Sequence, residues 1–342
     1  MPTEHWWAVL LGPVCARMPD LKSSYRPAWW LPGPHLPTIW GKFGRRQPLM
    51  HDRLERWATP DGDHLTIART GVARAGVPHL LVLHGLEGKL TANYAHGLLQ
   101  QARAHSWSAD LMMFRSCDGE VNSARRFYHS GETTDLDFVV RRLIAGQPES
   151  PLYIVGVSLG GNVTLKWLGE QGTETPPQVK AAAGVSVPFD LAAGSRFLER
   201  GFGAVYVRHF IRSLTAKIQQ KMVRFPDLVD PKALRKARTF WEFDNLVTGP
   251  LHGFRDAADY YERSSSIRYL DRITVPTLLL SALDDPFLPL SVLDRVREIA
   301  IHNPYLHAVF TRRGGHVGWI EGAPWNQSYY MERQVIEWLY NV

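Results

Sequence analysis

The pentapeptide Gly156-Val157-Ser158-Leu159-Gly160 places a serine between two glycines, directly after an apolar run. A serine hydroxyl attacks acyl carbons only when a base takes its proton, a third group orients that base, and N–H donors stabilise the oxyanion. Average glycine and serine usage of roughly 7% produces this pattern by chance in about one chain in ten. The predicted strand-to-helix junction, which is the setting of a nucleophile elbow, therefore carries most of the case for Ser158 as a nucleophile.

Candidates for the base and the orienting carboxylate follow later apolar segments. His316 comes after the apolar run that ends at Thr311, across a short loop with two glycines. Because a nucleophile elbow is typically followed by an acid and then by a histidine after the last strand, His316 is the predicted general base. Asp284 and Asp285 follow the apolar run 277–282, at the carboxyl end of a predicted strand. Only one of them can reach the imidazole, and their position leaves the choice open.

Two backbone amides are predicted to form the oxyanion hole. The N–H of Leu159, directly after the nucleophile, is the first donor. The second is expected from the loop 84–88, His-Gly-Leu-Glu-Gly, through the N–H of Leu86, where Gly85 permits close approach of the backbone. His84 in this loop is interpreted as a loop-organising residue rather than as a second base.

Apolar runs alternate with amphipathic segments, which predicts an α/β protein with a mostly parallel central sheet flanked by helices. The first expected elements are an antiparallel hairpin at 54–69, strands at 80–84, 109–114, 152–156 and 179–185, and helices at 91–105, at 132–144 with Ser130 as its cap, and from 159. After residue 275 we expect strands at 277–282 and 306–311, a helix near 290–301 and a terminal helix at 325–340.

The alternation is interrupted once, which sets the predicted domain organisation. Residues 190–269 lack strand signals and are interpreted as a helical cap inserted into one α/β core formed by 51–189 and 270–342. An independent second domain is the alternative. Residues 1–50 are predicted to be an arm packed on the core, because residues 25–40 combine prolines, which favour irregular structure, with tryptophans, which can pack on the domain.

Composition excludes several classes of function. Lys and Arg total 39 against 33 Asp and Glu in 342 residues, a formal charge of +6, but no nucleic-acid-reading motif accompanies this charge. Nucleic acid is therefore not an expected partner, whereas weak attraction to anionic substrates or membranes is compatible with it. No metal-ligand spacing, Rossmann fingerprint or P-loop occurs, so neither a metal nor another cofactor is expected.

The cysteines and the amino-terminal segment bear on localisation. Cys15 and Cys117 are far apart and form no CxxC pair, which favours a reducing cytoplasm. The apolar run 6–14 is too short to span a bilayer and lacks a preceding basic region. It is interpreted as a buried segment, with a peripheral membrane contact through Trp6 and Trp7 as the alternative.

Several longer motifs are similar to those of one family. The sequence resembles the YheT-like esterases of the AB hydrolase superfamily at LHGLEG (83–88), SGETTDLDFV (130–139), GVSLGGN (156–162), WWLPGPHLPTIW (29–40) and ALDDPFLP (282–289). The resemblance implies the α/β-hydrolase fold and a triad of Ser158, Asp285 and His316, since related hydrolases commonly carry the acid before a Pro-x-x-Pro run. Ser116 replaces a glycine of the family pattern near the expected pocket, so the substrate preference is open.

The expected activity is cleavage of carboxylic esters with short to medium acyl chains through an acyl-enzyme, with a small-molecule ester as the partner. An acyltransferase or a thioesterase would use the same acyl-enzyme, and a non-catalytic scaffold that binds a ligand is a third hypothesis. The cap contains aromatic and basic residues that form either an acyl-binding wall or an ordinary helix core: Phe197, Phe202, Tyr206, Phe210, Arg196, Arg200 and Arg208. The oligomeric state is left open.

Overall fold

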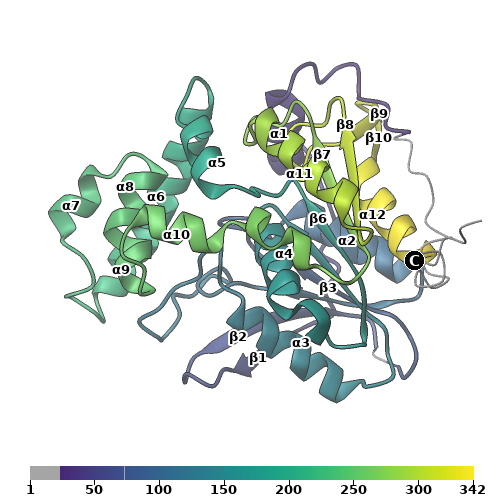
Figure 1. Ribbon diagram of the computed structural model, residues 1–342, viewed down its shortest axis with the longest axis horizontal. Helices are drawn as coiled ribbons and strands as arrows, with labels where there is room; N and C mark the ends of the chain where they lie inside the picture. Colours follow the sequence, from purple (N-terminus) through teal and green to yellow (C-terminus); the bar gives the residue numbers. More distant parts are fainter. Residues whose placement is uncertain (1–23, 73) are drawn as a thin grey trace, which may run out of the picture.

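The computed structural model describes residues 24–72 and 74–342 (Figure 1). The apolar run 6–14, with its alternative membrane contact, lies outside the described residues, so that hypothesis stays a prediction. Of the predicted arm, the structure describes residues 24–50, which include helix α1 (His35–Phe43).

A central sheet organises the described chain. Its eight strands are arranged in the order β1-β2-β4-β3-β5-β6-β7-β8, with β1 and β2 antiparallel to their neighbours and the remaining pairs parallel. The strands are β1 (Arg53–Ala58), β2 (His64–Thr70), β3 (His79–Leu83), β4 (Ser108–Met112), β5 (Leu152–Val157), β6 (Val179–Val185), β7 (Thr277–Ala282) and β8 (Leu306–Thr311). Strands β3, β4 and β7 are buried along their whole length, as expected for apolar runs covered on both faces.

Helices cover both faces of this sheet (Figure 1). On one face α2 (Asn93–Ala104) packs against α12 (Tyr330–Asn341), and on the other α3 (Thr134–Gly146) packs against α4 (Leu159–Gln171). Helix α11 (Leu290–His302) contacts β8. The predicted mostly parallel sheet flanked by helices is therefore confirmed.

Helix α3 begins later than predicted, and Ser130 does not cap it. The helix starts at Thr134, and the carboxylate of Glu132 accepts hydrogen bonds from the N–H groups of Thr134 (2.9 Å) and Asp135 (3.4 Å). A carboxylate near a helix N-terminus satisfies free amides and interacts favourably with the helix dipole. Glu132 thus has the role that the sequence analysis assigned to Ser130.

The carboxyl-terminal helix is also shorter than predicted. Residues before it form a two-stranded hairpin of β9 (Ile320–Ala323) and β10 (Asn326–Tyr329), and α12 begins only at Tyr330. The arm holds this hairpin, because Ala28 N–H donates to Ile320 O (2.9 Å) and the indole N–H of Trp30 donates to Gly322 O (3.0 Å). The arm and the hairpin lie side by side in Figure 1.

The segment between β6 and β7 is helical and projects from one side of the sheet (Figure 1). Its helices are α5 (Leu191–Leu198), α6 (Gly203–Met222), α7 (Pro231–Lys236), α8 (Phe240–Phe243), α9 (Gly249–Leu251) and α10 (Ala257–Ser264). We call residues 190–269 the cap. Apolar side chains between Leu198 and Val247 form a hydrophobic cluster of their own, whereas Ile267 is part of the main core.

Helix α6 has an apolar stripe that faces this cap cluster. Val207, Ile211, Leu214 and Ile218 are buried at the spacing of one helical face. Arg208 lies on the exposed side. In the part of the chain that the structure describes, no helix combines the length and the apolar character needed to cross a membrane.

Candidate active site

Ser158 lies at the sharp turn between β5 and α4, with φ 55° and ψ −119°. Such a conformation is strained for a residue with a side chain and projects the hydroxyl away from the sheet. The flanking glycines are required sterically. A Cβ on Gly156 would lie 2.3 Å from Gly160 O, and a Cβ on Gly160 would lie 2.6 Å from His84 O.

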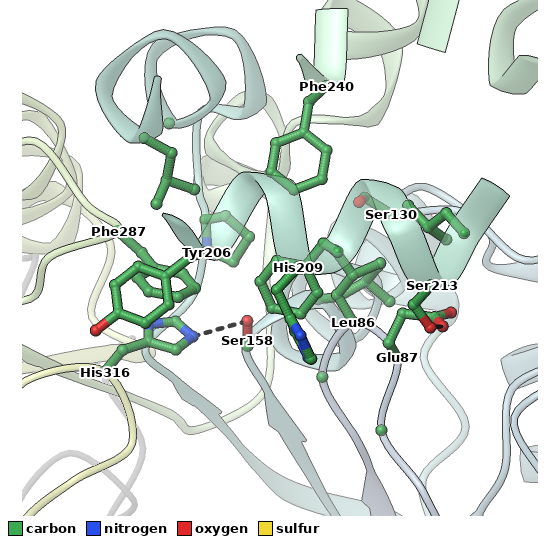
Figure 2. Close-up of a pocket in the computed structure, with 18 of the residues that line it drawn as sticks. Leu86, Glu87, Ser130, Ser158, Tyr206, His209, Ser213, Phe240, Phe287 and His316 are labelled. Carbon is green, nitrogen blue, oxygen red and sulfur yellow. Dashed lines mark hydrogen bonds between the residues drawn. The ribbon is translucent and has the colours of Figure 1, made fainter. Parts of the chain in front are cut away.

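Three of the predicted site residues meet at the carboxyl ends of β5, β7 and β8. His316 Nε2 lies 3.0 Å from Ser158 Oγ, and His316 Nδ1 lies 2.9 Å from Asp285 Oδ2 (Figure 2 draws the Ser158–His316 bond). Asp285 is buried and also accepts a hydrogen bond from Phe287 N–H (2.8 Å). In the tautomer with a proton on Nδ1, the imidazole donates to Asp285 and can accept the serine proton at Nε2.

The neighbouring acid, Asp284, has a different contact. Its Oδ1 accepts the N–H of Gly315 (2.9 Å), the residue before His316. Burial raises the pKa of Asp284 above its ordinary value. Asp285 therefore contacts the imidazole, and Asp284 contacts the backbone of the loop that carries it.

The arm reaches the same loop, which the sequence analysis did not predict. Thr38 Oγ1 accepts the N–H of His316 (2.8 Å) while its hydroxyl donates to Pro34 O (2.7 Å). Thr38 and His316 are 278 positions apart in the sequence. The hydroxyl of Thr38, in a segment rich in proline and tryptophan, was the available signal, but nothing local indicated its partner.

The two predicted oxyanion donors are free in the described structure. Neither Leu86 N–H nor Leu159 N–H has an acceptor among residues 24–72 and 74–342. Leu159 is the first residue of α4, where helix amides lack intrahelical acceptors. The residue before Leu86, Gly85, donates its N–H to the hydroxyl of Tyr94 (2.8 Å), which fixes the start of the loop.

His84 organises this loop from beneath. Its Nδ1 lies 2.7 Å from Gly85 O and its Nε2 accepts the N–H of Phe114 (3.1 Å), so both ring nitrogens are used. The side chain is fully buried, and this burial lowers its pKa to about 4. A neutral imidazole with both nitrogens engaged is unsuited to act as a second base.

A cavity of about 750 Å³ opens above Ser158, within the range of roughly 300–1,000 Å³ typical of small-molecule sites. The cap forms its roof, and Figure 2 shows Phe240 above Ser158 and His316, with Tyr206 and His209 closer to them. The apolar lining from the cap includes Tyr206, Phe210, Leu214, Phe240 and Phe243. The hydrophobic cluster of the cap extends onto Leu86 and Phe287, next to the oxyanion loop and the histidine.

Of the cap residues that the sequence analysis singled out, the structure brings only some to the cavity. Phe202, Tyr206 and Phe210 line it, whereas Phe197, Arg196, Arg200 and Arg208 do not. Arg196 stacks on the ring of Trp241, 5.0 Å from its centroid. No group of three or more His, Cys, Asp or Glu side chains in the described residues is arranged to hold a metal ion.

The chain belongs to the α/β-hydrolase fold family, whose model matches residues 78–323. This match confirms the predicted fold class. More particularly, the chain is similar to the candidate esterase YheT of Escherichia coli (strain K12), with 37% identity over 89% of each chain. The resemblance to the YheT-like family is thereby confirmed.

Two further comparisons extend this similarity. Phospholipase ABHD3 of Bos taurus is 29% identical over 92% of this chain and 78% of its own length. The structure of the Pyrococcus furiosus esterase Pf2001 superposes with a TM-score of 0.56 at 16% identity, covering 85% of this chain and 93% of that chain. At that identity the structural likeness shows the fold alone.

Proposed function

We propose that this protein is a serine hydrolase that cleaves carboxylic esters through an acyl-enzyme. The observation that carries the proposal is the chain of hydrogen bonds from Ser158 through His316 to Asp285 at the floor of the cavity. The relatives named above as esterase and phospholipase support ester chemistry.

The proposed reaction begins when Ser158 Oγ attacks the ester carbonyl carbon and its proton passes to His316 Nε2. Asp285 stabilises the resulting imidazolium, and the N–H groups of Leu86 and Leu159 donate to the oxyanion. The bond to the alcohol oxygen then breaks as His316 returns the proton to it. Water attacks the acyl-enzyme with His316 as base, which releases the carboxylic acid and restores Ser158.

The apolar wall of the cavity is the proposed binding surface for the acyl chain. Phe210, Leu214 and Phe243 line the cavity on the cap side, and burial of apolar surface contributes about 25 cal/mol per Å². Short to medium chains are the proposed substrates. We expect kcat/KM to rise with chain length until the cavity is filled.

The test combines active-site labelling with an ester series. A fluorophosphonate probe and p-nitrophenyl esters from acetate to dodecanoate are applied to the wild type, Ser158→Ala and Ser130→Ala. Ser130 also lines the cavity, but the structure gives its hydroxyl no histidine partner, so it is the matched control. Labelling should disappear only in Ser158→Ala. Equal labelling of Ser158→Ala and wild type would overturn the assignment.

A further inference from the structure

Glu87 directly follows Leu86 in the loop 84–88, yet its acidic side chain is almost completely buried. Only 7% of the side chain is exposed. Its backbone has φ 54°, a left-handed conformation that non-glycine residues rarely adopt. A strained backbone and a buried charge persist only where surrounding contacts hold them.

The first of these contacts is a reciprocal pair with Tyr128. The Tyr128 hydroxyl donates to Glu87 Oε1 (2.7 Å) and accepts the N–H of Glu87 (3.0 Å). Both the backbone and the side chain of Glu87 are therefore fixed by one phenol. The peptide unit that carries the Glu87 N–H directly follows the one that carries the Leu86 N–H. The Glu87–Tyr128 pair therefore orients the loop next to the proposed oxyanion donor.

The remaining contacts come from the cap. Lys217 Nζ donates to Glu87 Oε1 (2.7 Å), and the Ser213 hydroxyl donates to Oε2. Ser213 and Lys217 lie one turn apart on α6, so two side chains on one face of that helix bind the same carboxylate. Figure 2 shows Ser213 and Glu87 next to each other, with Leu86 between them and Ser158.

We propose that Glu87 is a positioning residue, through which cap helix α6 holds the Leu86 N–H in place for the oxyanion. This inference rests on the proposed function. Glu87 lines the cavity but takes no part in the proposed proton transfers or bond changes. It acts because a shift of the loop by a fraction of an ångström moves an amide that must lie about 2.7–3.1 Å from the developing charge.

The test compares Glu87→Gln with Lys217→Met, which changes the same contact from the cap side. Lys217 does not line the cavity, so a direct effect on substrate binding is not expected. Each variant should lower kcat about tenfold, which is less than the roughly 10²–10³-fold loss known for complete removal of one oxyanion donor, because the Leu86 N–H is displaced and not removed. KM should change by less than about twofold, since ground-state binding does not use this amide.

A transition-state analogue separates positioning from general structural damage. Trifluoromethyl ketones form a tetrahedral oxyanion adduct with an active serine, and we expect their affinity for Glu87→Gln and Lys217→Met to fall by the same factor as kcat. The methyl ether of the alcohol obtained by reducing the ketone has no carbonyl group and forms no adduct. Affinity for this ether should be retained. Ser213→Ala should show a smaller loss, and Ser213→Thr, which keeps the hydroxyl, should restore activity.

The matched control is a second ion pair that also joins the cap to the core. Arg125 and Asp227 form a bidentate pair with two N–O distances of 3.0 Å, away from the loop 84–88. Asp227→Asn should leave kcat and the ketone affinity unchanged, because exposed pairs contribute little and this one does not touch the loop.

Two outcomes would count against the inference. If folded Glu87→Gln and Lys217→Met keep wild-type kcat and ketone affinity, Glu87 has no positioning role. If Glu87→Gln fails to fold, equal kcat in Ser213→Ala, Ser213→Thr and wild type overturns the proposal instead. Loss of fluorophosphonate labelling in Ser158→Ala is independent of all these variants, so failure of the proposed function is recognised separately.

Discussion

The phenyl ring of Phe287 lies flat against the imidazole of His316, with ring centroids 4.0 Å apart and ring planes 9° apart. The same residue donates its N–H to Asp285 (2.8 Å). The loop 285–287 thus holds the imidazole twice, at its Nδ1 edge and on one face. The Nε2 edge points to Ser158 Oγ, 3.0 Å away.

Replacement of Phe287 by alanine should lower kcat. A stacked aromatic pair contributes about 0.5–1.5 kcal/mol beyond its buried area, and a ring face stabilises the imidazolium that forms during the reaction. We expect up to about a tenfold loss in Phe287→Ala and a loss below about twofold in Phe287→Tyr. Steady-state kinetics on a p-nitrophenyl ester measures both, and an unchanged kcat in Phe287→Ala would show that stacking does not contribute.

The two adjacent acids should respond very differently to amide substitution. Asp285→Asn removes the acceptor of the imidazole proton and should lower kcat about 10⁴-fold, the size of effect known for this kind of change. Asp284→Asn can still accept the Gly315 N–H through its amide oxygen, so its loss should be below about tenfold. The kcat values of the two variants decide the assignment, and the reverse order would make Asp284 the orienting acid.

Gly160→Ala should destabilise the whole domain. Its Cβ would lie 2.6 Å from two main-chain oxygens at the end of β3, and backbone cannot yield as a flexible side chain can. We expect a loss of about 3 kcal/mol in the free energy of unfolding, at the upper end of the usual overpacking cost. Gly146→Ala, at the end of α3 with open space around it, is the control and should change this free energy by less than about 1 kcal/mol. Urea denaturation measures both, and similar midpoints would contradict the steric argument.

Burial of His84 should make the protein sensitive to acid. Its pKa is about 4 in the folded state against an ordinary 6.5, so between these values the unfolded chain binds a proton that the folded chain does not. Stability therefore falls as the pH decreases from 6.5 to 4, and is fully present above 6.5. The difference between the folded and the ordinary pKa of His84 corresponds to about 3 kcal/mol in the free energy of unfolding.

His84→Asn tests this expectation. Asparagine can still donate to Gly85 O but leaves Phe114 N–H without an acceptor, so the variant should lose about 1–3 kcal/mol at pH 7.5. It should then lose less stability than the wild type between pH 6.5 and 4. Urea midpoints across this interval provide the comparison, and an equally steep decline in both proteins would rule out His84 as a source of the acid sensitivity.

The sequence allowed prediction of the features that depend on neighbouring residues. The glycines around Ser158, the apolar run before it and the position of His316 after the last strand are local patterns. Because parallel strands end at one edge of the sheet, these patterns predict that Ser158, His316 and one of the acids Asp284 and Asp285 lie together. The family resemblance implied Asp285, and the structure brings Asp285 to His316.

Contacts between distant segments could not be predicted in the same way. The hairpin β9–β10 has strands of only four residues, which are too short for a clear alternation, and its pairing with the arm is visible only in three dimensions. Thr38 and Lys217 carry no local sign of their partners. The acidic residue in the loop 84–88 was an available signal, since a charge beside an oxyanion donor requires a partner.

The contact between the arm and the β9–β10 hairpin has a consequence for synthesis of the protein. The indole of Trp30 bonds to a residue 292 positions later, and Ala28 and Leu31 pack on Ile320 from that hairpin. At roughly 5–20 residues per second, a ribosome needs about 15–60 s to make the partner after the arm emerges. During that interval the nascent chain presents apolar, tryptophan-rich surface, which is the kind of segment that molecular chaperones shield until the final strands are complete.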